Sequence, residues 1–280
     1  MIPEYSKVTS FEALLEGLGD RGAAILCGGT DLVVKMRGGL ASPARLLDIS
    51  DLPALRTVRE ERGALVIGAG ARVSELMSSP LVEQRLPLMP RVLAKLGSVQ
   101  IRHRATLGGN LVNASPAADS AVPLLLYDAQ VILRSVQGTR RLPVESFLRG
   151  PGKTALAEGE FLQSIVVPIP GKGFVPFFHK VGRRKALTIA IASLGALLRL
   201  GDGAIEEIRL AAGSVAPTPI RLHGVEDALS GRRLDEDLVA RARDLAASAV
   251  SPIDDIRGSA AYRRAVIGDL LAAFLREQLA

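Results

Sequence analysis

The sequence contains a single cysteine, Cys27, among its 280 residues. One thiol cannot form a disulfide within the chain, and cysteine-ligated zinc sites and iron–sulfur clusters need several thiolates. The chain by itself therefore holds no such centre. So little cysteine is also typical of a reducing compartment.

Tryptophan is absent, and aromatic residues make up only 4% of the chain. A surface that binds nucleic acid by stacking bases would have few rings to use, although the net charge is +6. The positive residues are scattered in short clusters. A basic surface that faces an acidic partner or an anionic cofactor explains the charge as well, so we expect no nucleic-acid binding.

Long apolar runs are missing too. No uninterrupted stretch could span a bilayer, and residues 1–11 do not show the basic region and apolar run of a signal peptide. We therefore expect a cytoplasmic protein without a transmembrane segment. With 48% hydrophobic and 23% charged residues, the composition is that of a globular protein with one large domain or two ordinary ones.

What is present is an alternation of short apolar segments, bounded by glycine, proline and polar residues. A capping box between Thr9 and Glu12 predicts a helix that ends near Gly19. Further segments predict strands at residues 23–27, 45–49, 64–67 and 130–135, and helices at residues 31–36, 73–77, 88–96 and 121–126. Residues 98–118 lack an apolar period, and so long a loop inside a compact domain is typical of a functional segment.

A linker is predicted at residues 168–173, which carry two prolines and two glycines. Beyond it, strands are expected at residues 174–181, 189–200 and 204–211, and helices at residues 217–229, 234–249 and 259–279. We therefore expect a domain boundary near residue 172.

Two segments combine paired glycines with hydroxyl residues. Gly28 and Gly29 follow an expected strand and precede a helical segment, and Gly108 and Gly109 lie within residues 98–118. Glycine lets the backbone take positive φ and approach a ligand closely. Successive N–H groups at such a turn, with a helix N-terminus, suit an anion such as a diphosphate, and two loops can bind it from both sides.

Each glycine loop taken alone is as well explained by an ordinary turn between two elements. Neither matches the G-x-G-x-x-G fingerprint of dinucleotide-binding folds or a P-loop. Residues 68–70 come closest to that fingerprint, but the third glycine is missing. The sequence does not favour a Rossmann fold.

Several motifs occur in order along nearly the whole chain. They are AILCGGTDL at residues 24–32, DISDLP at 48–53, QIR at 100–102, ATLGGNL at 105–111, NASPAAD at 113–119, FHKVGRR at 178–184 and DIRGS at 255–259. Together these motifs resemble the FAD-binding medium subunit of the xanthine dehydrogenase and aerobic carbon monoxide dehydrogenase family of molybdenum hydroxylases. One departure is Cys27, where that family more often has alanine.

The resemblance implies an α+β fold in two domains. The first is a PCMH-type FAD-binding domain at residues 1–172, made of two α/β subdomains at about 1–55 and 56–172. The second, at residues 173–280, is a smaller domain of antiparallel sheet and helices that is similar to the C-terminal domain of the CO dehydrogenase flavoprotein.

The resemblance also implies which residues contact FAD. One side of its diphosphate would be lined by Ile25, Leu26, Cys27, Gly28, Gly29, Thr30, Asp31 and Leu32, and the other by Thr106, Leu107, Gly108, Gly109 and Asn110. Asp119 would hydrogen-bond the cofactor, and Lys180 would lie near the isoalloxazine or the phosphates. Leu96 would give an apolar contact, and Leu162 falls on a strand whose backbone approaches the flavin.

Simpler roles stay open for these side chains. Asp31 and Asp119 could cap helices, Lys180 could be a solvated strand residue, and Leu96 and Leu162 could belong to the core. Cys27 is more readily explained as a small packing residue than as a redox thiol. The three histidines are not grouped with aspartate or serine into a triad, so we name no catalytic residue and no metal ligand.

For function, the resemblance implies an oxidoreductase subunit whose FAD receives electrons from [2Fe-2S] clusters of a small partner subunit and passes them to an external acceptor. A large partner subunit with a molybdenum cofactor would oxidise the substrate, within a dimer of heterotrimers. The cofactor carries the chemistry, and the protein supplies position and electrostatics. The alternative is a free-standing FAD-dependent oxidoreductase of the same cofactor fold, which needs substrate-binding and proton-donating groups of its own.

Overall fold

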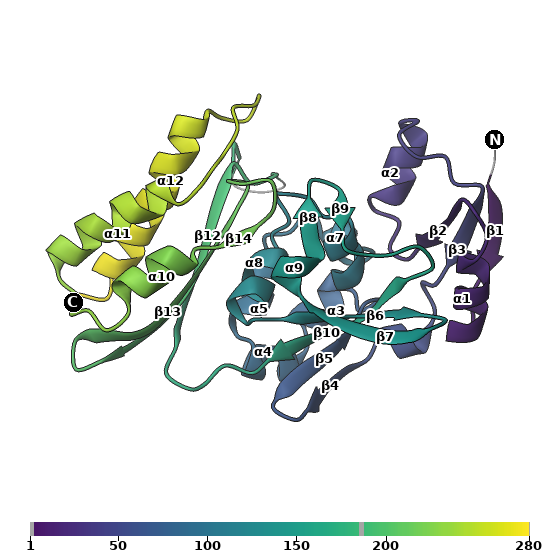
Figure 1. Cartoon of the computed structure of the whole chain (residues 1–280), viewed down its shortest axis with the longest axis horizontal. Coiled ribbons are helices and arrows are strands. Elements are labelled where there is room, and N and C mark those ends of the chain that lie inside the picture. Colours follow the sequence, from purple (N-terminus) through teal and green to yellow (C-terminus); the bar gives the residue numbers. More distant parts are fainter. Residues whose placement is uncertain (1–2, 185–187, 280) are drawn as a thin grey trace.

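The computed structural model describes residues 3–184 and 188–279. Three main sheets with their helices follow one another along the long axis: an N-terminal lobe (β1 to η1), a central region (β4 to β10) and a C-terminal region (β11 to α12), as Figure 1 shows. Helices are mixed with both parallel and antiparallel strands, so the α+β class expected from the sequence is confirmed.

The N-terminal lobe is a parallel sheet of three strands in the order β1-β3-β2. Its elements are β1 (Glu4–Lys7), α1 (Phe11–Leu18), β2 (Ala23–Leu26), α2 (Leu32–Arg37), β3 (Arg45–Asp48) and the 3-10 turn η1 (Pro53–Leu55). Helix α1 begins after Ser10, whose hydroxyl accepts a hydrogen bond from the Ala13 N–H, so the N-cap is Ser10 and not Thr9. Leu14 and Leu47 are buried in a small core, whereas α2 buries none of its residues.

The central region is built on an antiparallel sheet of five strands in the order β4-β5-β10-β6-β7. The strands are β4 (Val58–Glu61), β5 (Ala64–Gly68), β6 (Gln130–Ser135), β7 (Gly138–Pro143) and β10 (Phe161–Pro168), and a hairpin adds β8 (Leu148–Gly150) and β9 (Lys153–Thr154). Strand β10 lies in the middle of this sheet, and its pairing with β6 shifts register between Leu162 and Ser164.

Short helices flank this sheet, and all of them except α6 contribute buried residues to one core. They are α3 (Val73–Met77), α4 (Pro80–Arg85), α5 (Leu88–Leu93), α6 (Val99–Arg102), α7 (Leu107–Val112), α8 (Ala121–Leu126) and α9 (Val144–Phe147). Two of them, α6 and α7, lie within residues 98–118, so the expectation of one continuous loop there is wrong. Their N-caps are Ser98 and Thr106, and helices this short are capped by a hydroxyl without showing an apolar period.

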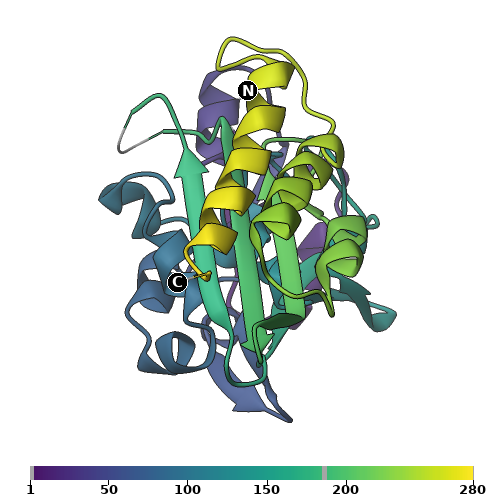
Figure 2. The same ribbon diagram turned by 90° about the vertical axis from the view of Figure 1, so that its left-hand side faces the viewer.

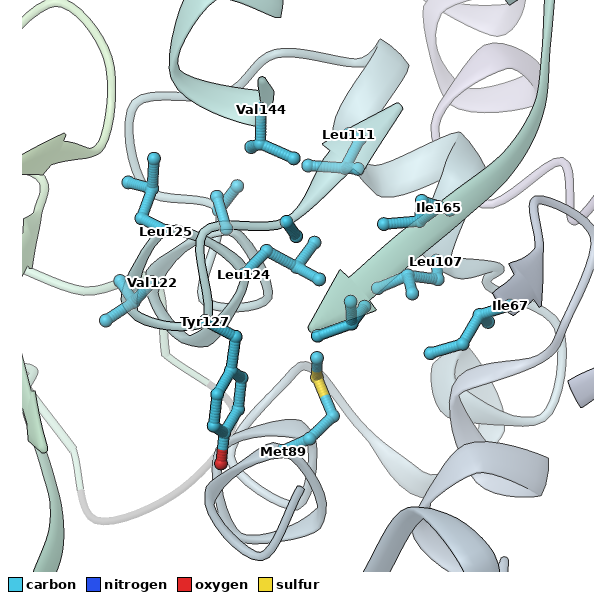
Figure 3. Packing of buried hydrophobic residues seen from close by; sticks show 14 of the residues in the cluster. Ile67, Met89, Leu107, Leu111, Val122, Leu124, Leu125, Tyr127, Val144 and Ile165 are labelled. Atoms are coloured by element: carbon cyan, nitrogen blue, oxygen red, sulfur yellow. The ribbon is translucent and has the colours of Figure 1, made fainter. Parts of the chain in front are cut away.

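Helix α8 crosses this core, and all of its residues are buried. Its side chains Val122, Leu124 and Leu125 are seen among other core residues in Figure 3. Tyr127, directly after the helix, is fully buried, and its hydroxyl oxygen accepts a hydrogen bond from the Leu88 N–H at 3.1 Å. Burial raises the pKa of Tyr127 to about 12.

The C-terminal region is an antiparallel sheet in the order β11-β12-β13-β14. Its elements are β11 (Val175–Val181), β12 (Ala192–Gly201), β13 (Ala204–Gly213), β14 (Ile220–Arg221), α10 (His223–Leu229), α11 (Glu236–Ser248) and α12 (Ala260–Arg276). The three helices cover one face of the sheet (Figure 2), and the other face contacts α8. Alternate residues of β12 serve the two cores: Leu194 faces the helices and Leu197 faces the central region. The helix expected at residues 217–229 is partly wrong, because α10 begins only at His223, after a bend and the two-residue strand β14.

No helix in the described ranges is long and apolar enough to cross a membrane. The described residues also contain no group of histidine, cysteine and acidic side chains that could hold a metal ion.

Candidate functional site

A cavity of about 310 Å³ opens between the N-terminal lobe and the central region. Its walls are the end of β2 with the loop into α2, the start of α7, and the start of β10. The expected site residues that line it are Ile25, Cys27, Gly28, Gly29, Thr30, Asp31, Leu32, Thr106, Gly108, Gly109, Asn110 and Leu162. The fold therefore brings both glycine loops to one cavity, although they lie far apart in the sequence.

The first wall is the loop between β2 and α2. Gly28 is pressed against the carbonyl group of Arg104, and a Cβ atom at Gly28 would collide with that oxygen. Gly29 has a φ of +71°, in the left-handed region that glycine favours. Within the part of the chain that the structure describes, the N–H groups of residues 29–32 donate no hydrogen bond. These donors suit an anionic ligand.

The second wall is the start of α7, and its donors are already used inside the protein. The Gly109 N–H donates to Thr106 Oγ1 at 3.1 Å, and the Asn110 N–H donates to the Thr106 carbonyl at 3.0 Å. The Gly108 N–H donates to the Ala69 carbonyl at 2.9 Å, and a Cβ atom at Gly108 would lie 2.5 Å from that of Ala69. The two glycine loops therefore differ: the first has donors to offer, and the second is fastened to the central region.

Cys27 lies between these walls and is partly exposed. Burial raises the pKa of its thiol, and a hydrogen bond with Thr106 only partly offsets this. A thiol that stays protonated is a poor nucleophile, so the packing role is the better explanation.

Some expected site residues do not line the cavity: Leu26, Leu96, Leu107, Asp119 and Lys180. Leu107 is fully buried on the apolar side of α7, which makes it a core residue. Leu96 is also in the core.

Asp119 and Lys180 instead form a second group beside the cavity. Lys180 Nζ lies 2.5 Å from Asp119 Oδ2 and donates to the Lys95 carbonyl at 3.0 Å, next to Leu96. Both side chains are almost buried, at 6% exposed for Asp119 and 7% for Lys180. Asp119 Oδ1 has no partner among the residues that the structure describes. Burial raises the pKa of Asp119, and the Lys180 ammonium offsets this only in part.

This geometry decides between the roles left open by the sequence. Asp31 occupies the N-cap position of α2, but its side chain makes no capping hydrogen bond and pairs with Lys35. Asp119 is not a helix cap, because the N-cap of α8 is Ser120. Lys180 is not a solvated strand residue, because its side chain is buried. The Asp119–Lys180 pair is connected to the cavity through Ser120, whose hydroxyl donates to Asn110 Oδ1 at 2.6 Å.

The sequence analysis missed three polar residues that line the cavity: Lys35, Asn113 and Glu160. Lys35 lies one helical turn after Asp31, which is the spacing of an ion pair on a helix and could have indicated it. Asn113 belongs to a motif already noted. Glu160 gives no signal in the sequence, because its partner Arg140 comes from another strand.

Two family models match the chain. A "FAD binding domain in molybdopterin dehydrogenase" matches residues 3–170, and a "CO dehydrogenase flavoprotein C-terminal domain" matches residues 177–278. The glyceraldehyde dehydrogenase medium chain of Sulfolobus acidocaldarius is 34% identical over 98% of both chains. The carbon monoxide dehydrogenase medium chain of Hydrogenophaga pseudoflava is 33% identical over 97% of this chain and 96% of its own.

Solved structures agree with these sequence matches. A carbon monoxide dehydrogenase from Hydrogenophaga pseudoflava, which lacks the Mo-pyranopterin moiety of its molybdenum cofactor, superposes with a TM-score of 0.93 at 33% identity, covering 98% of this chain and 96% of that one. Quinoline 2-oxidoreductase from Pseudomonas putida 86 superposes with a TM-score of 0.94 at 27% identity, covering 99% and 96%.

Proposed function

The chain belongs to the FAD-binding medium subunits of the molybdenum hydroxylase family, and on this premise we propose that it takes electrons from [2Fe-2S] clusters of a partner subunit and passes them to an external acceptor. The sequence-based prediction of the family is confirmed. So are an oxidoreductase subunit of the xanthine dehydrogenase and carbon monoxide dehydrogenase type, with FAD as its cofactor, and the predicted pairing of a PCMH-type FAD-binding domain with a CO dehydrogenase flavoprotein C-terminal domain.

We propose a domain boundary near residue 172, with the FAD-binding domain at residues 1–172 and the C-terminal domain at residues 173–280. The family models support it, because one match ends at residue 170 and the next begins at residue 177. Within the first domain, the division near residue 55 is supported by the change from a parallel to an antiparallel sheet.

The residues around the cavity fit FAD. A dinucleotide diphosphate is anionic, and the N–H groups of residues 29–32 are donors without an internal partner within the described ranges. The glycines keep the backbone accessible on this wall. Asp119 Oδ1, buried and unpaired, is a hydrogen-bond acceptor beside the same cavity, and a buried acceptor of this kind calls for a partner.

We assign the site residues as follows. Residues 25–32 line one side of the diphosphate, with the N–H groups of residues 29–32 as donors, and residues 106–110 shape the opposite side. Leu96, Asp119, Leu162 and Lys180 serve the flavin end. When bound, FAD supplies a carrier for two electrons that can also move one at a time. The chain supplies donors, exclusion of water by Leu162 and its neighbours, and the Lys180 ammonium, a fixed positive charge that favours negative charge on a nearby group.

Partner subunits complete the proposal. The relatives are described as medium chains and medium subunits, and one as a subunit of a dehydrogenase complex. We propose a small [2Fe-2S] subunit and a large molybdenum-cofactor subunit, arranged as a dimer of heterotrimers. The cytoplasmic location expected from the sequence stays a prediction.

The observation that carries the proposal is the single cavity formed by both glycine loops. The test is to isolate this chain by an affinity tag from cells that express its native partners. We expect a yellow complex that contains FAD, iron and molybdenum, whose flavin absorbance bleaches when substrate is added. The isolated chain could instead contain no iron or molybdenum, and its flavin could be bleached by substrate in the absence of partners. That result would support the alternative of a free-standing FAD-dependent oxidoreductase.

A further inference from the structure

Lys35 is the cationic residue of the cavity. It belongs to α2, and its Nζ donates to Asp31 Oδ2 at 2.6 Å and to Asn113 Oδ1 at 2.7 Å. Asn113 directly follows α7. Among the hydrogen bonds of the described residues, this is the one that joins α2 to α7. This side chain therefore adds a connection between the two walls of the cavity, beside the backbone contact of Gly28 with Arg104 and the hydrogen bond of Cys27 with Thr106.

The charged side chains that line the cavity are one cation and two carboxylates among the described residues. The cation is Lys35, and the carboxylates are those of Asp31 and Glu160. Glu160 is neutralised by Arg140, whose Nε lies 2.6 Å from Glu160 Oε1, and this pairing lowers the pKa of Glu160. Asp31 is about half exposed and has Lys35 as its ion-pair partner. The charge balance at the cavity therefore depends on where the Lys35 ammonium goes.

A dinucleotide brings two phosphate charges into this cavity, and its loop donors are neutral N–H groups. The ammonium of lysine is a compact charge on a flexible stem. It can leave a half-exposed carboxylate for a phosphate at little cost, because an exposed ion pair contributes little, whereas a charge-assisted bond to phosphate is stronger.

We propose that Lys35 is a cofactor-retaining residue that neutralises the diphosphate of FAD and ties α2 to α7 across it. The proposal rests on the proposed function, because it takes FAD as the ligand. Helix α2 buries none of its residues, so little else in the chain holds this wall in place. Loss of Lys35 is expected to act mainly on the rate at which FAD dissociates.

The test uses the full chain, freed of flavin and titrated with FAD while flavin fluorescence is followed. Lys35→Met should weaken FAD binding about tenfold, the equivalent of one charge-assisted hydrogen bond, and should raise the dissociation rate. Lys35→Arg should keep most of the affinity. Arg37→Gln is the matched control, because it removes one positive charge from an exposed position on the same helix, and it should leave the affinity unchanged.

Two further measurements separate binding of the phosphates from a purely structural pair with Asp31. The affinity of the wild type should fall with added salt more steeply than that of Lys35→Met. Asp31→Asn should tighten FAD binding, because it removes a competing carboxylate and frees the ammonium. If Lys35 only stabilises the loop through Asp31, then Asp31→Asn would weaken binding as Lys35→Met does, and the proposal is overturned.

Failure of this inference can be told apart from failure of the proposed function. If the wild-type chain binds no FAD, the function itself is wrong. If the wild type binds FAD and Lys35→Met binds it equally well, only the role of Lys35 is wrong. Thermal unfolding of each flavin-free variant, followed by circular dichroism, shows whether a loss of binding reflects loss of the fold.

Discussion

The two ends of helix α8 are both held by basic residues from the C-terminal region, but in different ways. At the end of the helix, Arg221 donates to the Leu125 carbonyl at 2.9 Å and Arg209 to the Leu126 carbonyl at 3.1 Å. Both arginines also bond Asp128. Before the helix begins, Lys180 meets Asp119, and one oxygen of that carboxylate has no partner in the described ranges.

The difference supports a structural role for the first contact and agrees with the proposed role of the second in the site. Cations near the last carbonyls of a helix are stabilising, and Arg221 further binds both oxygens of the nearly buried Glu226 at 2.8 Å. This end is complete without a ligand. The other end keeps a buried acceptor without a partner in the described ranges, and a buried acceptor of this kind calls for a partner. Four predictions test this contrast.

Arg221→Met should give the largest loss of stability. It leaves Glu226 buried without its ion pair, and removing one partner of a buried pair costs about 3–5 kcal/mol. Urea unfolding of the flavin-free chain measures it, with the exposed Arg243→Met as a control that should cost under about 1 kcal/mol. The folded variant should keep its FAD affinity. A marked loss of FAD affinity in folded Arg221→Met would show that this end also serves the site.

Lys180→Met should cost less stability, about 2 kcal/mol, because Asp119 can take up a proton instead of remaining a buried charge. It should also weaken FAD binding and lower the flavin reduction potential, since a nearby positive charge is lost. Potentiometric titration of the complex measures the second effect. If the reduction potential and the FAD affinity of this variant are unchanged, Lys180 has no role in the FAD site.

The stability that Asp119 contributes should decrease as the pH rises, because the pKa of its carboxyl group is raised in the folded chain. Burial raises the pKa of Asp119 above the ordinary 3.8, so the folded chain binds this proton more tightly than the unfolded chain. The stability of the wild type relative to Asp119→Asn should therefore fall as pH rises from 3.8 through the folded-state pKa. Unfolding of both proteins across this range checks it; a difference that grows with pH would mean that Lys180 dominates the pair.

Ser120→Ala should have the smallest effect. It removes the hydrogen bond to Asn110, worth about 1 kcal/mol, and loosens the connection between the second cavity wall and the start of α8. FAD affinity should fall by no more than a few fold, as measured by fluorescence titration. Ser230→Ala is a suitable control, because that hydroxyl bonds a carbonyl at the end of α10, far from the cavity in sequence and fold.

The sequence predicted elements whose apolar runs have clear ends. Helix α8 and strand β6 lie where expected, because polar residues bound their apolar runs, with Asp119 and Ser120 before the helix and Asp128 before the strand. The apolar pattern did not predict strand β10, because both of its faces are largely buried and its apolar and polar residues do not alternate. Helices α6 and α7 were missed because they are too short for a period.

The site was predictable to the extent that it depends on local backbone. Both glycine loops line the cavity, since paired glycines and a hydroxyl cap are local signals. The sequence could not predict which residue each side chain contacts, because the partners come from distant segments. Lys35 bonds Asn113, and Lys180 bonds the Lys95 carbonyl. The FAD contacts themselves stay a prediction, including those of Leu26 and Leu107, which lie outside the cavity lining.

The contact between Gly28 and the Arg104 carbonyl has a consequence for how a ligand enters. Backbone touches backbone there, with no side chain that could swing aside, so we expect this edge of the cavity to stay closed. At the opposite edge, the hydrogen bond between α2 and the end of α7 is made by the flexible side chain of Lys35, which can move aside. We therefore expect a dinucleotide to enter and leave past α2, while the contact between Gly28 and Arg104 is kept.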